Sequence, residues 1–454
     1  MTYRIGSGSG FSGDRVDAAI PVVRQMIADG GGGALIFETI GERTLALGHL
    51  ARRSNPRHGY DPLLSELLTP VLADCIRSRI VVVGNFGVAN PRAAADRIAR
   101  LAGELGLDGI QIAVVEGDDI REGLDLSGLE RWEGDTELRA GPSDIISANA
   151  YIGARHIAEA IQNGAQVVVT GRVADPSLVL GPLVAHFGWD WTDWDRLAAG
   201  TLAGHLLECG SQVTGGYFAD PGFKDVADLA DVGFPIAEVE ADGSFTITKP
   251  HGTGGVVDLR TVKEQILYEI HDPAAYLTPD VILDMTQVAI AQVGKDRVAV
   301  SGARGRPAPD RLKATIGVSG DWLGEAEISY AGPNALARAR LAADVVETRL
   351  RSQTSRVRRR YDFIGALSVF GGDDASPPGQ VLPEGPDIRM RLAVSASDKA
   401  EAELALREVG ALYCTGPAGG GGIRTRLQSR INTASYLVPR SMVEERHTFW
   451  EGEA

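Results

Sequence analysis

Residues 165–178, AQVVVTGRVADPSL, contain the pattern that decides the fold. Its three valines are apolar on both faces of an extended chain, which is typical of a buried parallel strand. Arg172 and Asp175 follow in a short turn, and Asp175 precedes Pro176 and an apolar run, as the N-cap of a helix does. The stretch therefore predicts a strand, a polar turn and a helix.

The same order of strand, polar turn and helix recurs on either side of this stretch, from residue 1 to about residue 190. Further strands are expected at YRIG (3–6), ALIFET (34–39), IVVVGNFG (80–87) and GIQIAVVE (109–116). Helical apolar spacing lies between them, notably in residues 14–30 and 90–106. This alternation predicts an α/β domain over residues 1–225, with a mostly parallel sheet flanked by helices.

The pattern changes after residue 225 to longer alternating strands, such as RLKATIGVS (311–319) and DIRMRLAVSAS (387–397). Two helices are expected there, at residues 336–350 and 398–413. The order of strands and helices predicts an α+β domain of split βαβ type over residues 226–454.

Composition limits the class of protein. The chain has 454 residues, a formal net charge of -15 and three cysteines, so we expect a soluble protein of a reducing compartment, with cytoplasmic location. The negative charge disfavours nucleic acid and anionic membranes as partners, and no stretch is apolar enough to span a membrane. We expect a homo-oligomer.

The strand-to-helix turns carry the unusual residues. Because ligands bind outside the carboxyl ends of parallel strands, these turns should line one edge of the sheet. Arg172 is placed there to hold a carboxylate or phosphate, whereas Asp175 is expected to be structural. The other substrate-binding candidates of these turns are Ser9, Asp14, Arg15 and Asn85.

The first turn, IGSGSGFSGDR (5–15), formally matches the dinucleotide-binding fingerprint at Gly8, Gly10 and Gly13. Glu38, at the end of the next strand, would then bind ribose. However, Asp14 would place a carboxylate in the first turn of the following helix, where a pyrophosphate needs free N–H groups. A glycine-rich loop for another ligand is the favoured interpretation, and a plain tight turn is the alternative.

Glu38 and Glu42 could lie one helical turn apart. Two carboxylates near a strand end suit acid/base catalysis or a divalent cation. The alternative is a solvated helix start, where acidic residues are favoured anyway.

His205, Glu208 and Cys209 share one predicted helix, with spacings that allow one common face. They could be a base and a nucleophile, a partial metal site, or core residues. No second cluster has metal-ligand spacing, so no zinc site is expected. A separate segment, KPHGTGG (249–255), could cradle an anion or carbonyl with His251, Thr253 and Gly254, or form only a turn.

Taken together, several long segments resemble the acyclic terpene utilisation AtuA family. They include IGSGSGFSGDR, VGNFGVANP, NAYIGARHIAEAIQNGAQVVVTGRVADPSLVLGPLVAHFGW, LAGHLLECGSQVTGG, GFPIAEVEADGSFTITKPHGTGG and GPAGGGGIR, in order along almost the whole chain. The family is named for bacterial pathways that degrade citronellol and geraniol through CoA thioesters. Its longer members carry a further C-terminal domain, which elsewhere is a separate small protein, so a small AtuA-like partner subunit is one expectation.

The resemblance implies an enzyme of carboxylate or acyl-CoA metabolism, acting by hydration, dehydration or hydrolysis on a branched substrate. Arg15 and Arg172 would hold anionic groups, Glu38 or Glu208 would move protons, and His205 or His251 would polarise an oxygen. Cys209 is a candidate nucleophile. The alternatives are a non-catalytic ligand-binding or scaffold subunit and an NAD(P)-dependent oxidoreductase.

Overall fold

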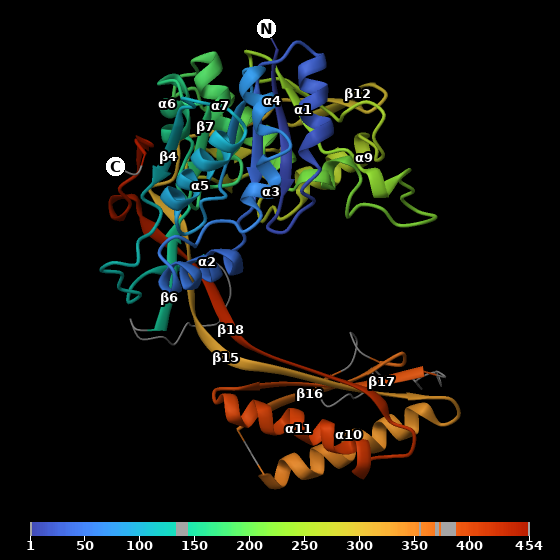
Figure 1. The fold of residues 1–454 in the computed structure, drawn as a ribbon. Coiled ribbons are helices and arrows are strands. Elements are labelled where there is room, and N and C mark those ends of the chain that lie inside the picture. Colours follow the sequence, from blue (N-terminus) through green and yellow to red (C-terminus); the bar gives the residue numbers. More distant parts are fainter. Residues whose placement is uncertain (1, 133–143, 354–355, 368–371, 374–386, 453–454) are drawn as a thin grey trace. The chain divides into compact units, whose positions relative to one another are not determined.

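The computed structural model describes residues 2–132, 144–353, 356–367, 372–373 and 387–452. It divides into two compact units, a larger one of Met1–Gly317 with Thr433–Ala454 and a smaller one of Val318–Asn432 (Figure 1). The boundary expected near residue 225 therefore lies inside the larger unit.

The larger unit is built on a ten-stranded sheet of order β12-β13-β9-β8-β1-β2-β3-β7-β4-β19. Its middle confirms the expected parallel arrangement, because β1, β2, β3, β7 and β4 run parallel to their neighbours. These strands are β1 (Tyr3–Gly10), β2 (Ala34–Glu38), β3 (Val81–Gly84), β7 (Val167–Thr170) and β4 (Ile112–Glu116).

Side chains of the parallel strands alternate between two apolar cores. Ile36 of β2 packs into one core, while its neighbours Leu35 and Phe37 pack into the other. The first core is closed by α6 (Arg155–Gln162), α7 (Ser177–Phe187), α8 (Trp194–Glu208) and α9 (Leu259–Leu267). The second is closed by α1 (Ala19–Ala28), α3 (Leu64–Leu68), α4 (Leu72–Arg77) and α5 (Pro91–Glu104). Burial on both faces explains the continuous apolar runs.

Antiparallel strands extend the sheet at both edges. Beyond β1 lie β8 (Ile236–Val239), β9 (Phe245–Thr248), β13 (Arg297–Ser301) and β12 (Ala289–Gly294). Beyond β4 lies β19 (Arg446–Phe449), from the last part of the chain. The alternating pattern that starts after residue 225 thus belongs first to additional strands of the same sheet.

Short elements complete the larger unit. A small sheet contains β10 (Tyr276–Leu277), β11 (Ile282–Asp284) and β14 (Arg304–Arg306). Helix α2 (Glu42–Ser54) follows the turn after β2. Strand β5 (Glu130–Arg131) pairs with β18, and β6 (Ile145–Ala150) pairs with β15.

The smaller unit has the order strand, helix, strand, strand, helix, strand, which is that of a split βαβ motif. Its sheet runs β16-β17-β15-β18. The elements are β15 (Arg311–Ala331), α10 (Ala335–Gln353), β16 (Arg358–Ile364), β17 (Asp387–Ala396), α11 (Lys399–Thr415) and β18 (Gly421–Pro439). The strand expected at 311–319 is thus the first part of one long strand, and both β15 and β18 cross the boundary between the units.

Gly8 and Gly10 lie within strand β1 and not in a loop, whereas Gly13 follows the strand in a turn with a φ of 94°. A side chain at Gly8 would place its Cβ 2.6 Å from Cε1 of Phe37, and one at Gly10 would meet the backbone of Cys209 at 2.4 Å. Helix α1 begins only at Ala19, so Asp14 does not lie in its first turn as expected. The glycines therefore serve close packing, which removes the geometry of the dinucleotide fingerprint.

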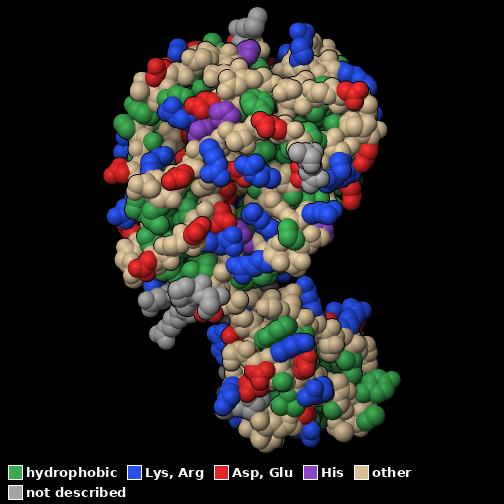
Figure 2. All heavy atoms as spheres, turned by 60° about the vertical axis from the view of Figure 1, so that its left-hand side comes forward, with side chains coloured by type: hydrophobic (Ala, Val, Ile, Leu, Met, Phe, Trp, Pro, Cys, Tyr) green, Lys and Arg blue, Asp and Glu red, His purple; other side chains and the backbone are tan. Residues whose placement is uncertain are grey.

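None of the helices within the described ranges is long and apolar enough to cross a membrane. On the face drawn in Figure 2, basic and acidic side chains are interspersed. The net negative charge is therefore not concentrated on that face.

We predict that Gly8→Ala destabilises the larger unit by about 1–3 kcal/mol, because the new methyl group must displace the buried Phe37 ring. The matched control is Gly103→Ala in α5, where nothing lies within 4 Å of the added Cβ. That variant should be about 0.5–1 kcal/mol more stable than the unmodified chain. Urea unfolding measures both changes, and equal effects at the two sites would contradict the packing role of Gly8.

Candidate functional site

The carboxyl ends of β1, β2, β3 and β7 meet at one edge of the sheet, as expected, and two adjoining cavities open there. The acidic cavity, of about 420 Å³, is lined by Asp14, Glu38, Arg172 and Cys209 among others. The larger cavity, of about 520 Å³, is lined by His205, Tyr276, Leu312 and Lys313 among others. The two cavities share Glu42, Tyr151, Asp175, Glu208 and Glu269 as lining residues.

Arg172 follows β7 and is buried, with 2% of its surface exposed. Its Nε donates to the Val173 carbonyl and its Nη1 to the Ile40 carbonyl, both at 2.8 Å, and its Nη2 pairs with Asp175. Asp175 thus does not cap helix α7, whose N-cap is Pro176 without a side-chain bond. A guanidinium that donates from all three nitrogens to the protein is a positioning group, and a direct role in substrate binding stays a prediction.

Glu38 ends β2 beside this guanidinium. Its Oε1 accepts hydrogen bonds from Asn85 Nδ2 at 2.9 Å and from the Ile40 N–H at 2.8 Å, and Asn85 Oδ1 accepts one from the Thr39 N–H. Burial, reinforced by the charge of Asp175, raises the pKa of Glu38 well above its ordinary value. Asn85 therefore orients a carboxyl group whose charged form is disfavoured by its surroundings.

A row of buried, hydrogen-bonded side chains contacts the backbone N–H of Arg172. Asp118 accepts hydrogen bonds from the Arg172 N–H at 2.9 Å and from Asn149 Nδ2 at 2.7 Å, and Asn149 Oδ1 contacts His49 Nε2 at 2.8 Å. Burial raises the pKa of Asp118 to about 6 and lowers that of His49 to about 4. His49 is thus neutral at neutral pH and donates to Asn149.

Glu208 and His205 form a buried pair on α8. His205 Nε2 lies 2.9 Å from the Gln265 carbonyl, and its Nδ1 lies 2.9 Å from Glu208 Oε1. A carbonyl only accepts, so Nε2 carries a hydrogen, and the contact between Nδ1 and Oε1 then needs one more proton. Burial raises the pKa of Glu208 to about 7. The pair therefore retains one shared proton.

The second oxygen of Glu208 lacks an internal partner. Glu208 Oε2 is buried and has no hydrogen-bond partner among the described residues. The residue itself is part of the wall of both cavities. Buried polar atoms are normally paired, so an unpaired oxygen on a residue that lines a cavity makes that residue a candidate to contact substrate or water.

Tyr151 contacts two positive charges at the site. The Arg172 guanidinium lies 4.4 Å and the Lys313 ammonium 4.9 Å from the centre of its ring. Its hydroxyl donates to Glu42 Oε1 at 3.2 Å. Burial opposes ionisation of Glu42, but its own backbone N–H, Lys313, Arg172 and this hydroxyl together hold its pKa below the ordinary value. Glu42 is thus ionised, and its pKa is shifted in the opposite direction to those of Glu38 and Glu208.

Glu38 and Glu42 do not lie one helical turn apart, because Glu38 belongs to β2 and Glu42 begins α2. Both line the acidic cavity, as do Asp14 and Cys209. Burial raises the pKa of the Cys209 thiol well above its usual range, which disfavours it as a nucleophile.

Other candidates of the first turn have internal partners. Asp14 accepts hydrogen bonds from the N–H groups of Gly10 and Arg15, both at 2.8 Å. Arg15 pairs with Asp17 at 3.0 Å and is not among the residues that line either cavity. The hydroxyl of Ser9 is buried and donates to the Phe11 carbonyl.

The KPHGTGG segment forms a separate small cavity of about 280 Å³ with His251, Thr253 and Lys295 in its wall. Thr253 Oγ1 donates to the Pro250 carbonyl, and an added Cβ at Gly254 would lie 1.9 Å from the Asp228 carbonyl oxygen. The structure thus does not bring His251, Thr253 and Gly254 together with the strand-end residues.

Sequence reasoning missed Tyr151, Lys313, Glu269 and Tyr276, which line the cavities from segments outside the parallel strands. Their only signal was the polar NAY and EIHD stretches around Tyr151 and Glu269. For metal binding, the described residues contain one group of three ligands at suitable spacing, His156, Glu159 and His447, and none of these lines either cavity.

Comparison with known proteins identifies one family. The profile of the family described as acyclic terpene utilisation family protein AtuA matches residues 3–449. A search of curated proteins finds no significant match. Among solved structures, the de novo designed protein Foldit4 aligns with 24% of this chain and 98% of its own, at 7% identity and a TM-score of 0.18. So low a score carries no argument.

We predict that Arg172→Met destabilises the larger unit by about 2–4 kcal/mol, because it leaves the half-buried Asp175 without its countercharge and the Ile40 and Val173 carbonyls without a donor. The control is Arg24→Met on the exposed face of α1, which should change stability by less than about 0.5 kcal/mol. Urea unfolding measures both. A loss at Arg172 as small as that of the control would contradict a positioning role and favour direct ligand binding.

Proposed function

The chain belongs to the acyclic terpene utilisation AtuA family, and on that premise we propose that it is a lyase that adds or removes water on a branched carboxylate or acyl-CoA. The observation that carries the proposal is the Glu208 carboxyl group, which lines both cavities, has an Oε2 without a hydrogen-bond partner among the described residues, and shares a proton with His205. The high pKa of Cys209 argues against hydrolysis through a thiol nucleophile.

The two cavities suit different parts of such a substrate. The larger cavity combines apolar side chains, including Leu277, Ile282 and Leu437, with the cations Arg311 and Lys313. A branched hydrocarbon would contact the apolar wall and an anionic group would pair with Lys313. The acidic cavity would repel an anion and is better suited to water or a hydroxyl group.

Two carboxyl groups with opposite pKa shifts supply the acid and the base. Glu208 holds a proton near neutral pH, whereas Glu42 is ionised, and both line both cavities. In dehydration, Glu42 would accept the proton from the carbon next to the carbonyl as that C–H bond breaks. The proton that Glu208 shares with His205 would go to the hydroxyl group, which leaves as water when the C–O bond breaks, and the electron pair of the broken C–H bond would form the new C=C bond.

The first test is turnover of a panel of branched, α,β-unsaturated acyl-CoA thioesters by the purified chain alone. Loss of the conjugated enoyl absorbance reports hydration. Turnover by the chain alone would support the lyase and exclude a purely scaffolding role. No turnover either alone or with a small AtuA-like subunit would overturn the proposal.

We predict that Glu208→Gln lowers kcat by about 10²–10⁴-fold, because the amide cannot deliver the proton. In the unmodified enzyme, dehydration needs protonated Glu208, so kcat should fall as the pH rises through about 7. This alkaline limb should be absent in Glu208→Gln. The control is Glu264→Gln, an exposed residue outside the cavities, which should keep the unmodified rate and profile. An unchanged limb in Glu208→Gln would contradict the assignment.

We predict that Lys313→Gln raises KM for the anionic substrate by roughly 10- to 150-fold, because one charge-assisted contact of about 1.5–3 kcal/mol is lost. The effect on kcat should be smaller, since Lys313 binds a part of the substrate that does not react. The matched control is Lys263→Gln on the exposed face of α9. Steady-state kinetics over a range of ionic strength measures both. An equal KM in the two variants would show that the anionic group of the substrate does not bind at Lys313.

A further inference from the structure

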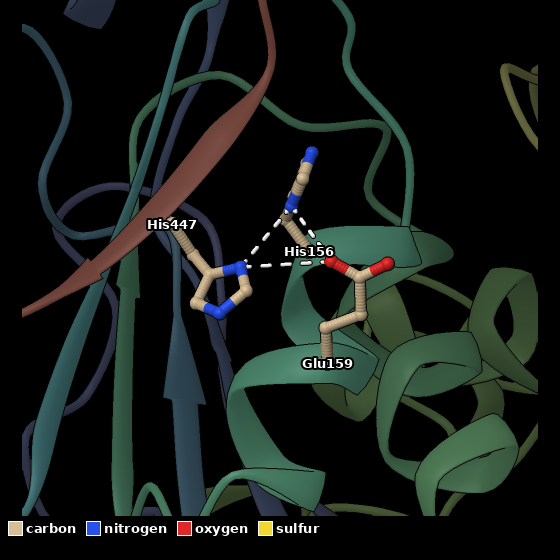
Figure 3. A group of neighbouring side chains, drawn as sticks. All are labelled: His156, Glu159 and His447. Atoms are coloured by element: carbon tan, nitrogen blue, oxygen red, sulfur yellow. Dashed lines mark hydrogen bonds and ion pairs between the residues drawn. The ribbon is translucent and has the colours of Figure 1, made fainter.

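Three metal-ligating side chains converge outside the cavities. His156 and Glu159 lie one turn apart on α6, and His447 reaches them from β19 (Figure 3). His156 Nδ1 lies 3.1 Å from His447 Nδ1 and 3.1 Å from Glu159 Oε2, and His447 Nδ1 lies 3.7 Å from Glu159 Oε2. All three potential ligand atoms therefore face one another.

The spacing matches one face of a zinc coordination tetrahedron. Ligand atoms about 2.0–2.1 Å from Zn²⁺ in tetrahedral geometry are separated by about 3.3–3.4 Å. The three observed separations of 3.1, 3.1 and 3.7 Å lie on both sides of that value. Two imidazoles and a carboxylate are also a ligand set that zinc accepts.

Hydrogen bonds within the cluster cannot satisfy all three of these atoms at once. A neutral imidazole has one donor, so a hydrogen on His156 Nδ1 can serve His447 Nδ1 or Glu159 Oε2 well, but not both. A cation between the three atoms would pair with every lone pair at once. The side chains are exposed by 21%, 38% and 17% for His156, Glu159 and His447, which leaves access for an ion and a water ligand.

We propose that His156, Glu159 and His447 bind one Zn²⁺ ion that fastens β19 to helix α6, with water in the fourth position. The two histidines are 291 residues apart in the sequence, and β19 is the strand that closes the sheet at β4. The bound ion would thus cross-link the last strand of the larger unit to a helix of its core. This role does not depend on the reaction proposed above, since none of the three residues lines its cavities.

The experiment uses the full chain, stripped with a chelator and dialysed. Zn²⁺ is titrated by calorimetry, and Co²⁺ is added as a spectroscopic probe of coordination geometry. We expect one site per chain with micromolar or tighter affinity, a four-coordinate Co²⁺ spectrum, and a melting temperature that rises with Zn²⁺ concentration because the ion binds the folded state.

The double variant His156→Gln and His447→Gln should lose more than about tenfold in affinity, since loss of even an outer-shell partner costs about that much. It should also lose the Co²⁺ spectrum and the rise in melting temperature. His58→Gln, an exposed histidine outside the cluster, is the control and should behave as the unmodified chain.

Glu159→Gln gives a second, milder variant on the surface of α6, and circular dichroism checks that each variant is folded. Weakened binding in folded Glu159→Gln supports the site even where the double variant does not fold. The proposal is overturned by the absence of saturable Zn²⁺ binding to the unmodified chain, or by equal binding in Glu159→Gln and the unmodified chain.

Discussion

The candidate site depends on one buried guanidinium. Arg172 joins the turn after β7 to the turn after β2 through the Ile40 carbonyl, and its charge compensates Asp175. Tyr151, which comes from a different segment, stacks on the same guanidinium. Burying an ion pair is costly, so it is tolerated only where further hydrogen bonds satisfy both partners. Here the carbonyls of Ile40 and Val173 accept hydrogen bonds from the guanidinium, and Asp118 accepts one from the backbone N–H of Arg172.

Much of the parallel sheet could be predicted from the sequence, because strands buried on both faces leave continuous apolar runs such as those at Val167 and Val82. The glycines were harder to interpret. A residue without a Cβ is needed both for a phosphate loop and for close strand packing, and only the position of Phe37 distinguishes the two. The domain boundary could not be predicted either, since β8 pairs with β1 and β9 pairs with β8 through backbone groups that leave little sequence signature.

The site itself was predictable where its residues are close in sequence. Helical spacing brought His205 and Glu208 together, and the strand-end rule brought Glu38, Asn85 and Arg172 to one edge. The protonation of the pair could not be predicted, because it depends on the Gln265 carbonyl from another helix. Lys313 and Tyr151 meet across β6 and β15. Their distance in the chain explains why no motif contained them.

The pairing of β19 with β4 has a consequence for biosynthesis. The ribosome synthesises β4 long before residues 446–449. The edge of β4 that faces away from β7 therefore has no strand partner while the whole smaller unit is translated. An unpaired edge is a template for wrong pairing, and long-range strand contacts form slowly. Completion of the larger unit is thus one of the last events of folding, and the nascent chain gains most from chaperone protection in that interval.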